Sequence, residues 1–125
     1  MWADKFVGLP FLKGGRDYPA FDCYGLVRYV LFDQTGFVLP RYDGDDKREI
    51  VHHAMAMKQV ALAEMKTFDV AVLLTDIRVG LTWKSAPVHI GVAVDAKNIL
   101  HIEEGFSSRV QSASDLRIHS IVRVT

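Results

Sequence analysis

The chain changes from loop to helix at Ala20-Phe21-Asp22-Cys23-Tyr24-Gly25-Leu26-Val27, a stretch that holds its only cysteine. Asp22 is a favourable N-cap because its carboxylate can accept a hydrogen bond from a backbone N–H of the first helical turn. Apolar residues then recur at helical spacing, and Gly36 suits the position just past a helix end. The stretch therefore predicts a helix that begins at Cys23 and ends before Gly36.

The cysteine in this first turn has two interpretations. The unpaired N–H groups and the positive dipole of a helix start stabilise a thiolate, which favours a role for Cys23 as a nucleophile. Free cysteine is also among the most buried residue types, which favours a structural role in the core. The residue taken alone does not decide between the two.

Other short motifs accompany the cysteine in a defined order. They are Gly8-Leu9-Pro10-Phe11, Gly14-Gly15, Leu39-Pro40, His89-Ile90-Gly91-Val92 and His101. Together with the helix start at Cys23, they resemble the NlpC family of papain-like cell-wall peptidases over nearly the whole chain. The aromatic residue after Cys23, with Arg28, is most similar to the versions found in tail-tip proteins of tailed phages.

The resemblance implies both a fold and an activity. It implies a papain-like α+β domain in which Cys23, His89 and His101 are the catalytic residues. The implied reaction is hydrolysis of an amide bond in peptidoglycan stem peptides, typically after a D-γ-glutamyl residue, with no cofactor and no metal. The implied partners are the peptidoglycan stem peptide and, for a tail-associated version, phage tail proteins.

Composition limits the classes of function. Fifteen basic and fifteen acidic residues give no net charge, and no basic stripe indicates a nucleic-acid partner. A single cysteine cannot form an intramolecular disulfide, so the fold does not depend on an oxidising compartment. With half of its 125 residues hydrophobic, the chain is expected to form a single domain over residues 1–125.

The location of the protein is also an expectation from sequence. The first residues lack the apolar core of a signal peptide, and no apolar run is long enough to span a membrane. We therefore expect synthesis in the cytoplasm, no membrane insertion, and delivery to the cell envelope as part of a phage tail.

The hydrophobic periodicity predicts helices first and strands afterwards, which is an α+β order. A short helix over 2–7 and the cysteine helix precede an amphipathic helix over 46–66. An antiparallel sheet of about five strands follows, and the cysteine helix covers one of its faces. The predicted strands are residues 68–74, 88–94, 99–103, 108–111 and 117–124.

The register of the hairpin that carries His89 and His101 decides whether the two histidines can meet. If the turn over Asp95-Ala96-Lys97 has an odd number of residues centred on Ala96, Gly91 lies across from His101. His101 then reaches His89 diagonally, over a residue without a side chain. The same register places Glu103 across from His89, so Glu103 is the alternative residue for orienting the imidazole. An even-membered turn would separate the histidines onto opposite faces.

The sequence departs from the family pattern near the expected site. Phe11 and Lys13 stand where the family has a tyrosine and a tryptophan, and Phe11 has no hydroxyl to donate. Tyr18 and Tyr24 are the alternative hydroxyl donors. Residues 76–86 are expected to form an ordered excursion beside the site, in which Trp83 can contact sugar or peptide. The candidate substrate-binding residues are therefore Phe11, Tyr18, Tyr24 and Trp83.

A further departure lies at the start of the first predicted strand. Phe68-Asp69-Val70-Ala71-Val72 resembles the Gly-Asp-Leu-Val-Phe strand of the family, with Phe68 in place of the glycine.

Three other readings use the same residues. A peptidase-like module that has lost activity would bind peptidoglycan or pack against tail proteins, and the changes at Phe11 and Lys13 favour it. A related papain-like enzyme would transfer acyl groups in lipid modification. Cys23, His89 and His101 would also give three ligands for a catalytic zinc, although no short-spaced ligand pair is present.

Overall fold

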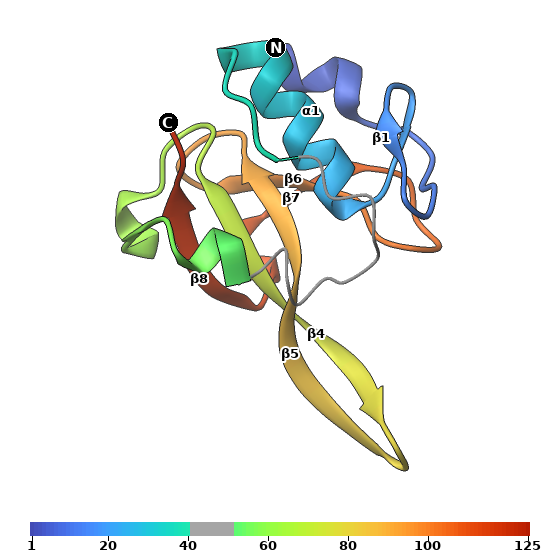
Figure 1. The fold of residues 1–125 in the computed structure, drawn as a ribbon. Helices are drawn as coiled ribbons and strands as arrows, with labels where there is room; N and C mark the ends of the chain where they lie inside the picture. Colours follow the sequence, from blue (N-terminus) through green and yellow to red (C-terminus); the bar gives the residue numbers. More distant parts are fainter. Residues whose placement is uncertain (41–51) are drawn as a thin grey trace.

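The computed structural model of the protein describes residues 1–40 and 52–125. Figure 1 shows the N-terminal helices lying over an antiparallel sheet that the C-terminal part of the chain builds. The N-terminal part contains the 3-10 helix η1 (Trp2–Phe6), the short strands β1 (Arg16–Asp17) and β2 (Ala20–Phe21), and helix α1 (Cys23–Thr35). This is the predicted α+β order.

Helix α1 begins and ends where the sequence predicts. The Asp22 carboxylate accepts a hydrogen bond of 2.8 Å from the backbone N–H of Gly25. Gly36 ends the helix in the left-handed conformation, with φ of 76°. One face of the helix is fully buried in the core, and it carries Leu26, Val27, Val30 and Leu31.

Within the described residues, the main sheet has six strands in the order β3-β8-β4-β5-β6-β7, and every neighbouring pair is antiparallel. Its strands are β3 (Lys58–Val60), β4 (Val70–Val79), β5 (Thr82–Ala93), β6 (Asn98–His101), β7 (Arg109–Ser112) and β8 (Ile118–Arg123). All five predicted strands are present. The additional strand, β3, pairs with β8 at one edge.

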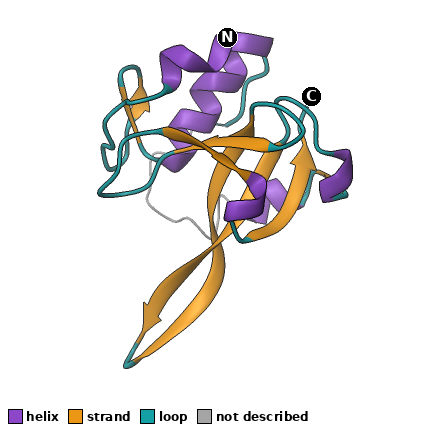
Figure 2. Ribbon diagram, turned by 180° about the vertical axis from the view of Figure 1, so that it is seen from behind, coloured by secondary structure: helices purple, strands orange, loops and turns teal. Residues whose placement is uncertain are grey.

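Alternate residues of the strands face two apolar clusters. Val70 and Val72 of β4 pack in the larger cluster with the buried face of α1. Ala71 and Leu73 belong to a smaller cluster that also contains Met65. The view from behind in Figure 2 shows the helices of the N-terminal part gathered on one side of the sheet. The period-two alternation of side chains along β4 therefore assigns one face to the helix, as the sequence predicts.

The amphipathic helix predicted over 46–66 is wrong beyond residue 55. Residues 52–55 are helical, but Lys58–Val60 form β3 and Leu62–Glu64 form a 3-10 turn; the predicted residues 46–51 lie outside the described part of the chain. The apolar spacing of this stretch fits a helix, but spacing alone does not exclude a strand. Here backbone pairing with β8 decides in favour of the strand.

The excursion expected over residues 76–86 is instead the outer half of a long hairpin. Strands β4 and β5 remain paired from Asp76↔Ser85 to Val79↔Thr82, and Figure 1 shows the hairpin projecting beyond the rest of the sheet. The hairpin turns at Gly80, whose φ of 63° falls in the region that favours glycine. The β-branched residues before and after this turn suit extended strands.

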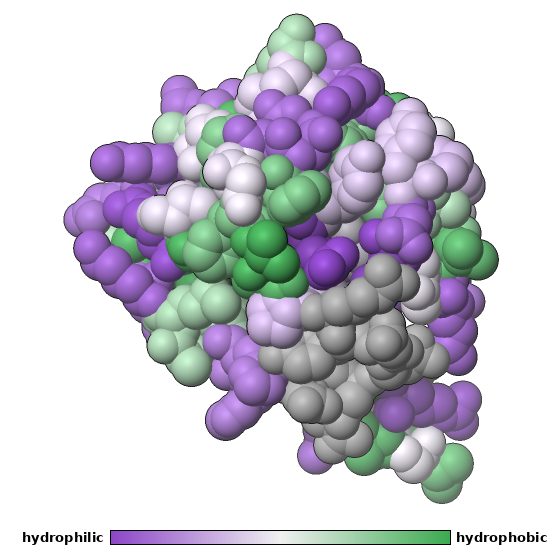
Figure 3. Space-filling model, turned by 45° about the horizontal axis from the view of Figure 1, so that its top comes forward, coloured by the Kyte–Doolittle hydropathy of each residue, from purple (hydrophilic) through white to green (hydrophobic). Residues whose placement is uncertain are grey.

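The surface mixes hydrophilic and apolar side chains. Figure 3 shows apolar residues scattered among hydrophilic ones over the face that it presents. On the projecting hairpin, the most exposed apolar side chains are Leu81, which is 92% exposed, and Trp83, which is 67% exposed. In the described part of the chain, no helix has both the length and the apolar character needed to cross a membrane.

Candidate active site

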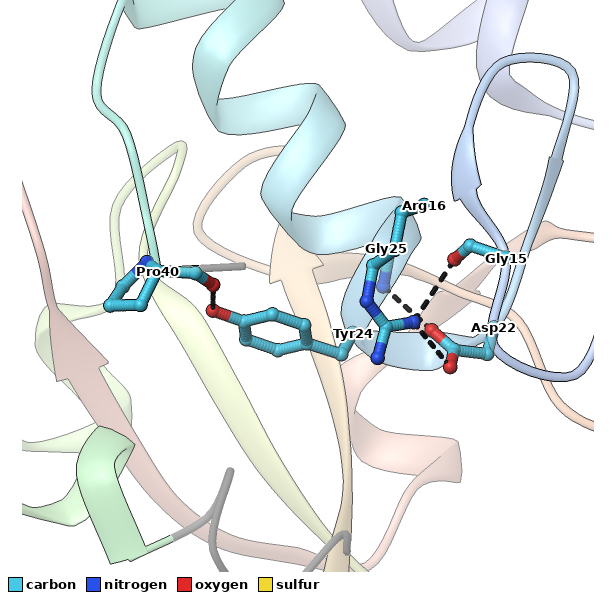
Figure 4. A network of polar contacts seen from close by, with 6 residues as sticks. All are labelled: Gly15, Arg16, Asp22, Tyr24, Gly25 and Pro40. Carbon is cyan, nitrogen blue, oxygen red and sulfur yellow. Dashed lines mark hydrogen bonds and ion pairs between the residues drawn. The ribbon is translucent and has the colours of Figure 1, made fainter. Parts of the chain in front are cut away.

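Cys23 occupies the first position of α1, and a buried ion pair holds this helix start in place. Arg16 Nη1 donates to Asp22 Oδ2 at 2.5 Å and to the carbonyl oxygen of Gly15 at 3.1 Å (Figure 4). The Arg16 side chain is 1% exposed, so its charge is compensated almost entirely within the protein. Asp22 thus caps the helix with one carboxylate oxygen and pairs with Arg16 through the other.

Two glycines let the preceding loop approach the first helical turn. A Cβ added to Gly25 would lie 1.9 Å from the carbonyl oxygen of Gly15, a distance that no side chain tolerates. The backbone N–H of Asp22 also donates to this carbonyl, at 3.3 Å. The glycines at these positions are therefore required for the loop to fix Cys23 at the helix start.

His89 and His101 are in direct contact. Strands β5 and β6 pair in the register Val92↔Leu100 and Ala93↔Ile99, which is the register of an odd turn centred on Ala96. His89 Nε2 lies 3.0 Å from His101 Nδ1, and both imidazoles are buried. The diagonal contact expected from the hairpin argument is present.

Sequence reasoning missed the residues that hold His101 from its other side. His101 Nε2 lies 2.5 Å from Gln111 Oε1, and Gln111 Oε1 also accepts a hydrogen bond of 3.1 Å from Arg109 Nε. Arg109 Nη2 in turn donates to Glu103 Oε1 at 2.5 Å. Strand β7 pairs with β6 and places Gln111 diagonally from His101. Sequence periodicity alone does not show which strands pair or in which register, so this contact could not be predicted.

The predicted contact of His89 with His101 is present, and Glu103, the alternative residue for orienting His89, forms an ion pair with Arg109. Burial is the main cause that lowers the pKa of His101 below its ordinary value of 6.5, and the positive charge of Arg109 lowers it further. The hydrogen bond to Gln111 Oε1 and the charge of Glu103 raise the pKa of His101, against these two effects. The balance keeps His101 neutral near pH 7.

Cys23 and His89 line the same cavity, of about 300 Å³. Phe11 lines it as well, so this aromatic residue shares the cavity with Cys23. The remaining lining residues come from the base of the β4–β5 hairpin and from the segment after β6; they are Thr75, Asp76, Ile77, Ile102, Glu103 and Glu104.

Among these lining residues, Asp76 carries a negative charge. Hydrogen bonds from Ser85 and Arg117 lower the pKa of Asp76, so its carboxylate stays ionised near pH 7.

The other candidate substrate-binding residues lie elsewhere. Tyr24 is buried, and its hydroxyl donates to the carbonyl oxygen of Pro40 (Figure 4). Tyr18 is half exposed and packs its ring against Phe21 and Tyr29. Trp83 lies on the projecting hairpin. The described lining of the Cys23 cavity contains none of these three side chains.

A metal centre is not indicated by the described residues. In residues 1–40 and 52–125, no three His, Cys, Asp or Glu side chains are close enough to hold a metal ion together. The site combines a thiol at a helix start, an imidazole that lines the same cavity, and a second imidazole hydrogen-bonded to the first. These groups are suited to nucleophilic and acid-base chemistry.

Comparison with known proteins gives consistent matches. The model of the family described as NlpC/P60 matches residues 8–120. Gamma-D-glutamyl-L-lysine dipeptidyl-peptidase of Bacillus subtilis (strain 168) is 34% identical over 96 residues, which are 77% of this chain and 28% of that protein. Protein P54 of Enterococcus faecium is 47% identical over 34 residues, covering 27% of this chain and 7% of that protein. The chain thus spans at most 28% of the length of these curated relatives.

Solved structures show the same fold. The NlpC/p60 domain of the peptidoglycan hydrolase SagA superposes with a TM-score of 0.68 at 21% identity, covering 98% of this chain and 93% of that one. NlpC2 from Trichomonas vaginalis superposes with a TM-score of 0.70 at 16% identity, covering 94% of this chain and 42% of that one. At these identities the likeness concerns the fold.

Proposed function

The chain belongs to the NlpC/P60 family, and from this premise we propose that it is a cysteine peptidase that hydrolyses amide bonds in peptidoglycan stem peptides. The observation that carries the proposal is the arrangement around one cavity. Cys23, at a helix start, and His89 both line this cavity, and His101 is hydrogen-bonded to His89. A nucleophile, a base and a group that orients the base are the components that such a reaction requires.

The proposed mechanism assigns one role to each residue. The Cys23 thiolate attacks the carbonyl carbon of the scissile bond, and the backbone N–H of Cys23 at the helix start helps to stabilise the oxyanion. One such donor is commonly worth about 3 kcal/mol in the transition state. His89 then protonates the leaving amine, and later removes a proton from the water that hydrolyses the thioester. His101 orients the His89 ring throughout.

We propose a γ-linked D-glutamyl bond as the scissile bond. The support is the Bacillus relative, whose name describes cleavage between γ-D-glutamate and L-lysine, and the family resemblance of the motifs around Cys23. Phe11 in the cavity wall would pack against the stem peptide without donating a hydrogen bond.

The setting of the enzyme rests on the sequence resemblance alone. We propose a single NlpC-type domain over residues 1–125, made in the cytoplasm and carried to the cell envelope with phage tail proteins. The similarity of the Cys23-Tyr24 start and Arg28 to tail-tip versions is the sole support for this route.

A second candidate is a module of the same fold that binds peptidoglycan without cleaving it. Phe11 favours it, because this residue lines the cavity but lacks the hydroxyl of the family tyrosine. In such a module the Cys23 thiol would titrate like an ordinary cysteine.

Alkylation of Cys23 separates the two candidates. Iodoacetamide reacts with the thiolate, so the rate across about pH 4 to 9 reports the titration of the thiol. For the peptidase we expect reaction well below the free-thiol pKa of about 8.5, and an upward shift in His89→Ala. Hydrolysis of a stem tripeptide, L-Ala-γ-D-Glu-L-Lys, would follow by mass spectrometry with Cys23→Ala as the control. A thiol that titrates normally and is indifferent to His89 would favour the binding module.

A further inference from the structure

Gln111 lies between two nitrogen donors. Its Oε1 is 3.1 Å from Arg109 Nε and 2.5 Å from His101 Nε2. An arginine Nε carries a hydrogen and never accepts one. The amide of Gln111 must therefore present its oxygen here, because the reversed amide would set an NH₂ group against Arg109 Nε–H.

Arg109 is itself fixed in this position. Its Nη2 donates to Glu103 at 2.5 Å, and its guanidinium lies 4.7 Å from the centre of the Phe106 ring. A bonded and stacked guanidinium has few alternative rotamers, so the orientation of the Gln111 amide is set from outside the histidine pair.

The orientation of the amide determines the tautomer of His101. Since Gln111 Oε1 accepts, His101 Nε2 must carry the hydrogen. His101 is 1% exposed, and burial disfavours its charged form. A neutral imidazole with a hydrogen on Nε2 has its lone pair on Nδ1. His101 Nδ1 therefore accepts the hydrogen bond from His89 Nε2.

We propose that Gln111, oriented by Arg109, is a positioning residue that sets the tautomers of both histidines, so that His89 can take up a proton only at Nδ1. The inference rests on the proposed function, in which His89 is the base for Cys23. In the opposite tautomer, His89 Nε2 would hold the lone pair and face His101, and it would be lost as a base toward the cavity.

The proton balance of the step is simple. The S–H bond of Cys23 breaks, its electron pair stays on sulfur, and the proton forms an N–H bond at His89 Nδ1. The resulting imidazolium keeps its hydrogen bond from Nε2 to the lone pair of His101 Nδ1. The proton then passes from Nδ1 to the leaving amine.

Nitrogen-15 NMR of the imidazoles tests the inference directly on the whole chain at pH 8. Protonated and unprotonated ring nitrogens have well-separated shifts, and His89→Ala and His101→Ala assign the signals. We expect hydrogen on Nε2 and none on Nδ1 for His101, and hydrogen on Nε2 for His89. Hydrogen on His101 Nδ1 would overturn the proposal whether or not the protein hydrolyses peptides.

Variants then test the role of the amide. Gln111→Met keeps the size of the side chain and removes the acceptor, whereas Gln111→Glu keeps an acceptor. We expect a mixture of His101 tautomers and at least about a tenfold loss of kcat with KM unchanged for Gln111→Met, and recovery of a single tautomer in Gln111→Glu. Gln59→Met, on strand β3, is the matched control and should match the parent.

The two proposals fail in different ways. Expected tautomers with no hydrolysis by the parent would contradict the peptidase function and leave the tautomer assignment standing. Unchanged tautomers and unchanged kcat in Gln111→Met would overturn the role of Gln111 while the peptidase stands. If Gln111→Met does not fold, the spectrum of the parent protein alone decides the assignment.

Discussion

Gly91 lies directly against His101: a Cβ added to Gly91 would stand 3.0 Å from the Cβ of His101. The same added atom would lie 2.7 Å from Ile99 Cγ2. The absent side chain is what allows His101 to reach across β5 and bond to His89 at 3.0 Å. Gly91 is therefore required for the contact between His89 and His101.

Gly91→Ala should impair the histidine pair more than the fold. The added methyl group has to displace Ile99 and His101, and overpacking of this kind costs roughly 1–3 kcal/mol of unfolding free energy. Since His101 moves away from His89, we expect activity to fall by more than the loss of folded protein explains. Urea unfolding and kcat are the measurements. Ile99→Ala combined with Gly91→Ala should be less destabilised than the sum of the single variants; additive costs would contradict the clash.

Asp22→Ser should be destabilising even though serine is a good N-cap. The substitution keeps a capping oxygen but removes the Asp22 carboxylate that pairs with the buried guanidinium of Arg16, which should cost about 3 kcal/mol. Adding Arg16→Met should recover part of this loss. The control is Arg117→Met, which breaks the exposed pair with Asp76 and should lower stability far less, because solvent screens an exposed ion pair. Equal effects of Asp22→Ser and Arg117→Met in chemical denaturation would contradict the buried pair.

Local signals near Cys23 and along the β5–β6 turn were sufficient to predict much of the site. The Asp22 cap, the Gly36 end and the register centred on Ala96 depend on neighbours in sequence, and the structure has all three. The partners of Arg16 and Gln111 were not predicted, because they depend on which backbone segments approach one another in space. The segment after residue 51 was mispredicted because its apolar spacing fits a helix, whereas pairing with β8 makes part of it a strand.

Phe68 adopts a conformation that suits glycine, which explains the glycine that the family has at this position. Its φ is 72°, and its ring lies 4.9 Å from that of Trp2. Phe68→Gly and Phe68→Ala both lose the ring contact, but only alanine retains the strain of a positive φ. We expect the glycine variant to be more stable than the alanine variant by about 1 kcal/mol. Thermal or urea unfolding of the two variants side by side is the measurement, and an alanine variant of equal stability would contradict the strain.

Stability should decrease as the pH falls below about 6.5. The pKa of His101 is lowered in the folded protein, chiefly by burial, so the unfolded chain binds the proton more readily. Above the unfolded pKa of 6.5, His101 is neutral in both states and does not affect the free energy of unfolding. As the pH falls from 6.5 toward the folded pKa, protonation of His101 in the unfolded chain lowers the free energy of unfolding. The lowered pKa values of Asp33, Asp76 and Asp95 contribute stability that is fully present above their unfolded value of 3.8 and is lost only as the pH falls below it, so they do not change the slope between about pH 5 and 7. Midpoints of thermal unfolding between about pH 5 and 7 should therefore show a smaller slope in His101→Asn than in the parent.

Tyr24→Phe should lower stability without lowering the rate of the chemical step. The Tyr24 hydroxyl donates to the Pro40 carbonyl oxygen and does not line the cavity that holds Cys23 and His89. Loss of this partly buried hydrogen bond should cost about 1 kcal/mol. Tyr29→Phe is the matched control on the same helix and should be nearly neutral. We expect kcat of Tyr24→Phe to stay within about twofold of the parent, since a neutral hydroxyl acting in the transition state is worth far more than that. A loss of a hundredfold or more would show instead that this hydroxyl replaces the family tyrosine that Phe11 lacks.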